Sequence, residues 1–272
     1  PVYNDWKSLN KLLTKLDDNL KKKISNIEIL IINDNSTDKL KLFSRKFSCI
    51  KKINILTLSK NVGSQRAIAL GLLYLKKIKN DFIVTVMDSD GEDDPLEVPK
   101  MISLAMKNSN YVITSNRKSR KETRLIIFLY HMHLLLTFLF TFKWISFGNF
   151  IYFHKKNLSR LFIDNSSFCA HSSAVMKNCS IKRIYARRKK RYFDKSKLGL
   201  TSLIEHSLRV NAVFLKNIIC YSIIYIFIFT VFLPEILNLF ILALILTFNF
   251  LIAFIKFKYP KKYISYSKQK VL

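Results

Sequence analysis

Two long apolar segments near the end of the chain constrain its fold most strongly. Residues 217–233 give 17 consecutive positions without a charged side chain, and residues 236–255 give 20. Each segment is close to the length that a helix needs to cross ~30 Å of hydrocarbon. Because only Pro234 and Glu235 separate them, the sequence predicts a hairpin of two transmembrane helices.

Basic residues flank this pair of segments on its outer sides. Residues 181–197 hold nine Lys or Arg, residues 256–270 form a second basic segment, and the tight turn between the spans has none. Lys and Arg near membrane spans favour the cytoplasmic side. We therefore expect a multi-pass protein of the cytoplasmic (inner) membrane, with the N-terminal part and the tail in the cytoplasm.

A third apolar segment covers residues 125–142 and contains no Lys, Arg, Asp or Glu. Its length permits a transmembrane helix, and the alternative is a helix that lies in the membrane interface. A crossing here would put the basic run 181–197 on the opposite side of the membrane from the acidic residues near position 90. We favour the interfacial helix because it keeps these polar segments together.

Residues 1 to about 115 alternate between helical and strand patterns. Apolar residues at spacings of three and four predict an amphipathic helix that contains Trp6, Leu9, Leu12, Leu13, Leu16 and Leu20. Further helices are predicted at 65–75 and 95–106, and strands at 27–32, 53–58, 81–87 and 111–114. Apolar strands separated by helices indicate an α/β domain with a mostly parallel sheet covered on both faces.

The carboxylates of this basic chain gather in the stretch VTVMDSDGEDDP, residues 84–95. The chain has 18 acidic and 46 basic residues and a net charge of +28, yet five acids lie in this stretch: Asp88, Asp90, Glu92, Asp93 and Asp94. Ligands of open α/β sheets bind beyond the carboxyl ends of strands, and Mg²⁺ takes one or two carboxylates plus substrate phosphates. Asp88 and Asp90, with Glu92 as a third ligand, are therefore a candidate metal site. The alternative is a solvated acidic turn that caps the helix starting near Pro95, and the last two acids fit the first turn of that helix.

Several short motifs resemble, in order, those of family 2 glycosyltransferases of the dolichol-phosphate mannosyltransferase and bactoprenol glucosyltransferase type. They are PVYND at 1–5, NDNSTD at 33–38, NVG at 61–63 with Ala67 and Gly71, MDSDGEDDP at 87–95, Arg117, Arg124, and Arg191 with Ser196 and Lys197. The predicted membrane hairpin also fits this subgroup. The resemblance covers nearly the whole chain and implies a Rossmann-like GT-A nucleotide-sugar-binding domain.

The resemblance implies a role for each matching position. The nucleotide-sugar donor would be bound by Pro1, Tyr3, Asp5, Asp34, Ser89, Arg191 and Lys197. Asp88, Asp90 and Glu92 would hold Mg²⁺ or Mn²⁺ on the diphosphate of the donor. Arg117 and Arg124 would face the acceptor phosphate, to which Arg can donate two parallel hydrogen bonds. Asp88, Asp90, Arg117 and Arg124 are therefore the expected catalytic residues.

The resemblance also divides the chain into four parts. Residues 1–124 would form the GT-A catalytic domain, whose first strand precedes Pro1 in the family. Residues 125–212 would supply the interfacial helix and a segment that binds the acceptor and phosphates. Residues 213–256 would form the two transmembrane helices, and residues 257–272 a basic cytoplasmic tail.

The function implied is metal-dependent, inverting transfer of a single sugar from a nucleotide-sugar to a polyprenyl phosphate, undecaprenyl or dolichyl, at the cytoplasmic membrane face. Its partners would be the donor, the acceptor and membrane lipid, with a homo-oligomer left open and no nucleic acid expected. One alternative is a processive polysaccharide synthase, although neither Trp6 nor Trp144 belongs to the Q-x-x-R-W motif typical of that class. The other is a non-catalytic basic membrane protein that binds anionic lipid or nucleic acid, although most aromatic residues lie in the apolar segments.

Overall fold

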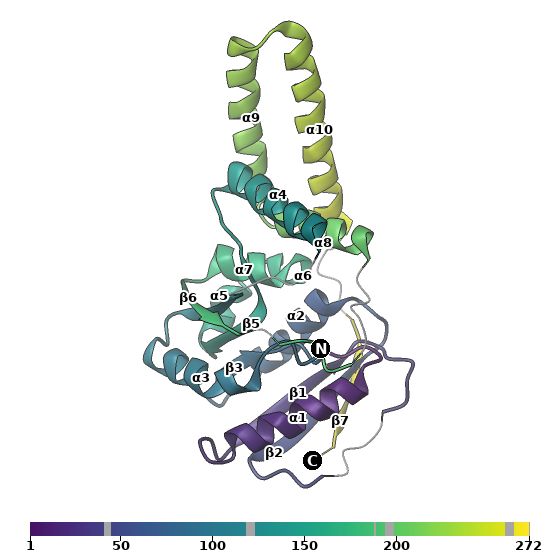
Figure 1. The fold of residues 1–272 in the computed structure, drawn as a ribbon, viewed down its shortest axis with the longest axis vertical. Coiled ribbons are helices and arrows are strands. Elements are labelled where there is room, and N and C mark those ends of the chain that lie inside the picture. The colour runs from purple at the N-terminus through teal and green to yellow at the C-terminus, as the bar shows by residue number, and fades with distance from the viewer. Residues whose placement is uncertain (41–44, 118–122, 188, 194–198, 259–263, 272) are drawn as a thin grey trace.

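A computed structural model of the chain describes residues 1–40, 45–117, 123–187, 189–193, 199–258 and 264–271. Two sheets with their helices form the body, and a helical hairpin of α9 (Leu215–Phe232) and α10 (Glu235–Lys258) extends from it (Figure 1). Within the described residues, α9, α10 and α4 (Arg124–Thr141) are long and apolar enough to cross a membrane, judged by length and composition. The predicted hairpin is therefore present, with the turn at Pro234.

The first sheet has the strand order β1 (Ile27–Asn33), β2 (Ile50–Leu58) and β7 (Tyr266–Lys270). β1 and β2 run parallel, and β7 pairs antiparallel with β2. Side chains alternate across a strand, so Ile31 packs in the cluster of α1 (Trp6–Leu20) and Ile32 in the cluster of α2 (Ser64–Lys76). All six apolar residues predicted for the first helix are buried on α1.

The second sheet has the strand order β3 (Ile83–Val86), β5 (Phe147–His154), β4 (Val112–Arg117) and β6 (Ile181–Ala186). β5 runs antiparallel to both neighbours, whereas β4 and β6 are parallel. One face packs on α3 (Val98–Lys107), which follows the 3₁₀ turn η1 (Pro95–Glu97), and the other on α7 (His171–Asn178). The short helices α5 (Asn157–Leu161) and α6 (Ser166–Cys169) lie between β5 and α7 in the chain.

The α/β class predicted from the sequence is confirmed, and all four predicted strands are present. The expectation of one mostly parallel sheet is corrected in detail: the described residues form two sheets, and both mix parallel and antiparallel pairs. The parallel pairs are β1 with β2 and β4 with β6. The antiparallel pairs are formed by β5 and β7, which the sequence patterns do not predict. The sheet architecture thus depends on strands contributed by the second half of the chain.

Helix α4 lies across the foot of the hairpin, near α8 (Leu200–Ala212) (Figure 1). The Tyr225 hydroxyl of α9 donates a hydrogen bond to the carbonyl of Leu139 on α4, 2.5 Å away. The strands on either side of α4 in the chain, β4 and β5, pair directly with each other, with Ile113 opposite Tyr152. Both ends of α4 therefore return to one sheet.

The C-terminal segment also returns to the body of the protein. Residues 257–272 are expected to be a basic tail, and their described part contains β7, which lies on the edge of the first sheet. The backbone N–H of Val271 also donates to the carbonyl of Ile53, 2.9 Å away. The chain after the hairpin is thereby attached to the same sheet as the chain before it.

Candidate active site

The site lies where β1 and β3 end and the first residues of the chain join them. Val2 forms a parallel bridge with Asn33: its N–H donates to Ile32 at 2.8 Å, and its carbonyl accepts from the N–H of Asp34 at 2.9 Å. Pro1 consequently lies beside Asp34, Asp88 and Asp90. The carboxyl ends of two strands thus bring together acids that are far apart in the sequence.

Asp34 joins this site to the loop that precedes α2. Its side chain is buried and accepts hydrogen bonds from the backbone N–H groups of Val62 and Gly63, each at 2.8 Å. Burial raises the pKa of Asp34, and these two N–H groups oppose the rise. Gly63 has φ of 80°, a conformation that glycine adopts without strain. Asp34 therefore fixes the wall of the site as well as contributing charge to it.

The acidic stretch after β3 divides into two groups. The Asp93 carboxylate accepts from the backbone N–H of Asp88 at 3.0 Å, and Asp94 accepts from the N–H of Leu96 at 3.1 Å as the N-cap of the η1 turn. The prediction that these last two acids belong to the start of the following helix is thus confirmed for Asp94. Asp93 instead closes the turn that presents Asp88.

The middle of the acidic turn requires a glycine. Gly91 has φ of 84°, and a Cβ atom at this position would lie 2.2 Å from the ring of Tyr192. The Asp90 carboxylate accepts from the N–H of Glu92 at 3.0 Å, while its carbonyl accepts from the N–H of Tyr192 at 3.0 Å. The segment 189–193 is therefore seated directly on the turn that carries Asp90.

Arg191 lies between two carboxylates of the site. Its Nη1 is 3.3 Å from Oδ2 of Asp90, and its Nη2 is 3.4 Å from Oδ2 of Asp5, the N-cap of α1. Burial, together with the charge of Asp88, raises the pKa of Asp90 to about 6, and Arg191 opposes the rise. One guanidinium group thus leaves the negative charge of this site only partly balanced.

The carboxylates fit a divalent cation as a two-residue set. Asp88 and Asp90 interact strongly enough for Asp88 to raise the pKa of Asp90, and a hard cation would relieve that repulsion. Across the described ranges, no group of three or more His, Cys, Asp or Glu is arranged to hold a metal ion. Glu92 is therefore not gathered with the other two as a third ligand, and substrate phosphates would have to complete the coordination.

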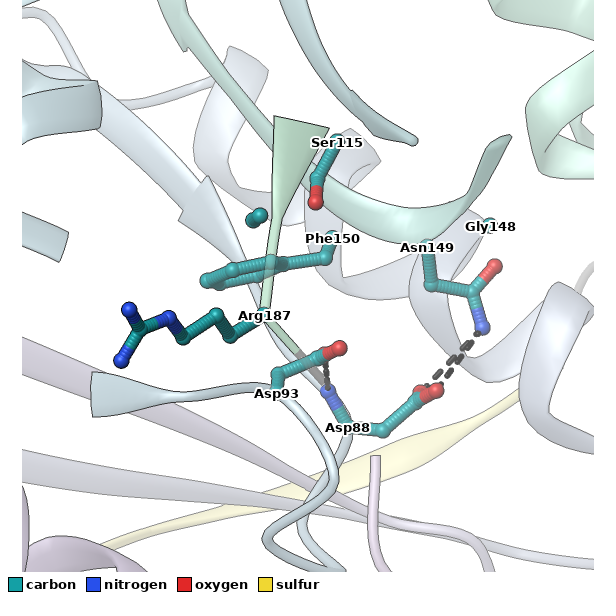
Figure 2. A pocket seen from close by; sticks show the side chains of 8 residues that line it. Asp88, Asp93, Ser115, Gly148, Asn149, Phe150 and Arg187 are labelled. Carbon is teal, nitrogen blue, oxygen red and sulfur yellow. Dashed lines mark hydrogen bonds between the residues drawn. The ribbon is translucent and has the colours of Figure 1, made fainter. Parts of the chain in front are cut away.

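Two polar residues that the motifs do not point to also belong to the site. Nδ2 of Asn149, on β5, lies 3.2 Å and 3.4 Å from the two oxygens of Asp88 (Figure 2). Gln65, on α2, donates to Asn149 at 2.9 Å. Asn149 also lines a cavity of about 30 Å³ whose walls are Asp88, Asp93, Ser115, Gly148, Asn149, Phe150, Ala186 and Arg187. The only sequence signal for Asn149 is one amide within the apolar run FGNFIYF.

Comparison with known proteins identifies the family. The sequence profile described as Glycosyl transferase family 2 matches residues 1–184. The chain belongs to glycosyl transferase family 2. The family assignment from the motifs is therefore confirmed, and the acids at the ends of β1 and β3 lie within the matched region.

The chain is also similar to curated proteins with more specific names. One is the undecaprenyl-phosphate 4-deoxy-4-formamido-L-arabinose transferase of Aeromonas hydrophila, 28% identical over 125 residues, which are 45% of this chain and 37% of that protein. Another is the dodecaprenyl-phosphate galacturonate synthase of Rhizobium johnstonii, 23% identical over 124 residues, 45% of this chain and 36% of that protein. The matched part spans little more than a third of these relatives.

The remaining positions of the family 2 motifs are placed as follows. Tyr3 is 44% exposed beside the site, and Ser89 lies in the turn between Asp88 and Asp90. Arg117 is the last residue of β4, and Arg124 is the exposed first residue of α4. Lys197 lies outside the described residues. The structure thus gathers Asp5, Asp88 and Asp90 with Arg191, and it places Arg124 at the start of the helix that lies across the foot of the hairpin.

Proposed function

We propose that this family 2 enzyme transfers a single sugar from a nucleotide-sugar to a polyprenyl phosphate at the cytoplasmic face of the membrane. The observation that carries the proposal is the gathering of Asp34, Asp88, Asp90 and Arg191 at the carboxyl ends of β1 and β3. The names of both relatives, which act on undecaprenyl phosphate or form a dodecaprenyl-phosphate product, support the choice of acceptor.

The acidic turn supports a donor that carries a diphosphate. Asp88 and Asp90 would hold Mg²⁺ or Mn²⁺, which would stabilise negative charge on the leaving nucleotide. Arg191 lies next to Asp90 and is placed to stabilise the negative charge that develops on the phosphates of the leaving nucleotide. Asp34 and Asp5 define the side of the site toward residues 1–5, where the nucleotide would bind.

The acceptor needs positioning more than activation. A phosphate monoester is already ionised near neutral pH, so its oxygen can attack the sugar without a general base, and a single displacement inverts the anomeric carbon. Arg117 and Arg124 are proposed to orient this phosphate, because a guanidinium group matches phosphate oxygens bidentately. Arg124 begins α4, whose exposed apolar side chains include Leu125, Phe128 and Met132.

The sheet pairings support a topology with two membrane crossings. A spanning α4 would separate β4 from β5 by the membrane, yet these strands are hydrogen-bonded neighbours. The hairpin of α9 and α10 returns the chain to the starting side, which agrees with the pairing of β7 and β2. We therefore propose that α4 lies in the interface and that only the hairpin spans the bilayer.

A transfer assay tests the proposed activity. The full chain would be reconstituted with undecaprenyl phosphate, Mg²⁺ or Mn²⁺, and each common nucleotide-sugar in turn, and lipid products would be resolved by mass spectrometry. We expect one donor to give a lipid phosphate that carries one sugar. A ladder of longer glycans would indicate a processive synthase, and a folded protein that uses no donor would contradict the proposal.

Labelling from one side of the membrane tests the proposed topology. Engineered cysteines between residues 145 and 195 should react only with a reagent supplied at the cytoplasmic face, as should cysteines before residue 115. Reaction of the first group from the outer face alone would show that α4 crosses the membrane.

A further inference from the structure

A chain of hydrogen bonds leads from the interior of the protein to Asp88. The backbone N–H of His171, the first residue of α7, donates to Oε1 of Gln65 at 2.7 Å. Nε2 of Gln65 donates to Oδ1 of Asn149 at 2.9 Å, and Nδ2 of Asn149 donates to Oδ1 of Asp88 at 3.2 Å. Residues of α7, α2 and β5 are thereby connected to the carboxylate that follows β3.

The direction of every bond in this chain follows from its first donor. A backbone N–H can only donate, so Gln65 must turn its oxygen toward His171 and its nitrogen toward Asn149. Asn149 must then accept with its oxygen and present its nitrogen to Asp88. The order would be lost if either amide were rotated, because two oxygens or two nitrogens would then face each other.

Burial makes this arrangement costly to disturb. Gln65 is 7% exposed, and His171 is fully buried. Burial lowers the pKa of the His171 ring to about 4, so the ring is neutral near pH 7 and brings no charge to the network. A buried amide with a misplaced partner loses the hydrogen bonds that offset its desolvation. The backbone N–H at the start of α7 therefore fixes the orientation of the Gln65 and Asn149 amides, which lie 84 positions apart in the sequence.

We propose that Gln65 and Asn149 are positioning residues that hold the Asp88 carboxylate for the diphosphate-bound cation, an inference that rests on the proposed function. Asn149 donates from Nδ2 to both oxygens of Asp88, at 3.2 Å and 3.4 Å, and so fixes the plane of the carboxylate. Gln65 does not contact Asp88 itself and acts through the orientation of Asn149.

The substitution Gln65→Glu reverses the order of the bonds with almost no change in shape. The introduced carboxylate would still accept from His171, but its second oxygen would need a donor, so Asn149 would rotate and turn its oxygen toward Asp88. Two acceptors would then face each other. The further substitution Asp88→Asn supplies a donor and restores the pairing. We expect Q65E to lower the unfolding temperature, and D88N to raise it far more in the Q65E background than in the wild type.

The matched control is Asp90→Asn, which removes the same charge two residues away. If D88N restored stability merely by reducing negative charge, D90N would restore as much. Coupling of Gln65 to position 88 and not to position 90 supports the network, and equal effects of the two substitutions in both backgrounds would overturn it. Should Q65E fail to fold alone while Q65E/D88N folds, the coupling is shown directly.

Binding of Mn²⁺, followed by its electron paramagnetic resonance, tests the positioning role without requiring turnover. Gln65→Met keeps the length of the side chain but leaves Asn149 free to rotate, and we expect it to weaken Mn²⁺ binding several-fold, with inorganic pyrophosphate added as the diphosphate probe. Unchanged Mn²⁺ affinity in a folded Q65M variant would overturn the positioning role. Coupling in the stability cycle without sugar transfer by the wild type would instead refute the proposed function and leave the network intact.

Discussion

The carboxylates of Asp17 and Asp90 are both shielded from solvent, with side chains 0% and 14% exposed, yet their pKa values are shifted in opposite directions. Burial would raise the pKa of Asp17, but backbone N–H groups of Ser48, Cys49 and Ile50 outweigh it and lower the pKa to about 2. For Asp90, burial and the charge of Asp88 raise the pKa to about 6. The fold therefore stabilises the ionised form of Asp17, whereas it disfavours the ionised form of Asp90.

This difference separates a structural acid from a functional one. The carboxylate of Asp17 accepts its N–H donors at 2.7–3.3 Å and attaches α1 to the start of β2. Asp90 caps one N–H of its own turn and shares a single guanidinium group with Asp5. A charge that the fold leaves poorly balanced is available to a cationic or cation-bound ligand.

The largest expected effect is on catalysis at Asp90. Asp90→Asn should reduce sugar transfer by ~10²–10³-fold, the usual loss when an electrostatic contact to developing charge is removed. The same substitution should leave the unfolding temperature at pH 7.5 unchanged or raised, because it removes an ionised group that repels Asp88. Transfer assays and thermal unfolding of one preparation check both. If D90N lost stability as well as activity, Asp90 would be a structural acid like Asp17, and the contrast between the two residues would fail.

The opposite pattern is expected at Asp17. Asp17→Ala removes the acceptor of three backbone N–H groups at a buried position, so we expect the free energy of unfolding to fall by about 2–3 kcal/mol. Donor affinity and turnover of the folded fraction should not change. Asp18→Ala is the matched control, because Asp18 is exposed and pairs with Arg45 at the surface, and its effect on stability should be much smaller. A kinetic defect in folded D17A would show that Asp17 also acts on the site.

The same contrast explains which parts of the protein the sequence predicts. Periodicity places α1 and the first four strands because apolar spacing records which face is buried, and the motifs around Asp34 and Asp88 are carried by loops at strand ends. Asp17 gives no such signal, since it lies among the buried leucines of α1 and its donors are the first residue of β2 and the two residues before it, 31 to 33 positions later in the sequence. Its role exists only once the tertiary structure has formed.

Asn149 and the strand β7 escape sequence analysis for related reasons. Asn149 reads as a single interruption of an apolar strand, and its meaning depends on Gln65 and Asp88 from two other elements. β7 has the sequence YSKQK, a polar edge strand without the alternation of a half-buried strand. Both features depend on contacts between distant segments, which local pattern and composition do not record.

A smaller effect is expected in the pH dependence of stability. The folded pKa of Asp17 is lowered, so its stabilising contribution is present above pH 3.8 and is lost as the pH falls toward about 2. The folded pKa of Asp90 is raised, so its ionised form destabilises the fold above about pH 6, and this cost disappears as the pH falls to 3.8. Unfolding of the wild type, Asp17→Asn and Asp90→Asn across this range checks both windows. Curves that change in the same window would show that the two environments do not differ.

The smallest effect is expected from the cation that already faces Asp90. Arg191→Gln removes the group that opposes the raised pKa of Asp90, so this pKa should rise further and the upper end of the Asp90 window in the pH–stability curve should move above pH 6. Lys190→Gln removes the same charge from an exposed neighbour and should leave the curve unchanged. Transfer by R191Q should fall by ~10-fold, since a hydrogen bond to a charged group is worth about 1.5 kcal/mol. If K190Q and R191Q shifted the curve equally, long-range charge and not the contact with Asp90 and Asp5 would set the balance. The difference between Asp90 and Asp17 would then rest on the backbone N–H donors of Asp17 and on the proximity of Asp88 to Asp90, without a contribution from Arg191.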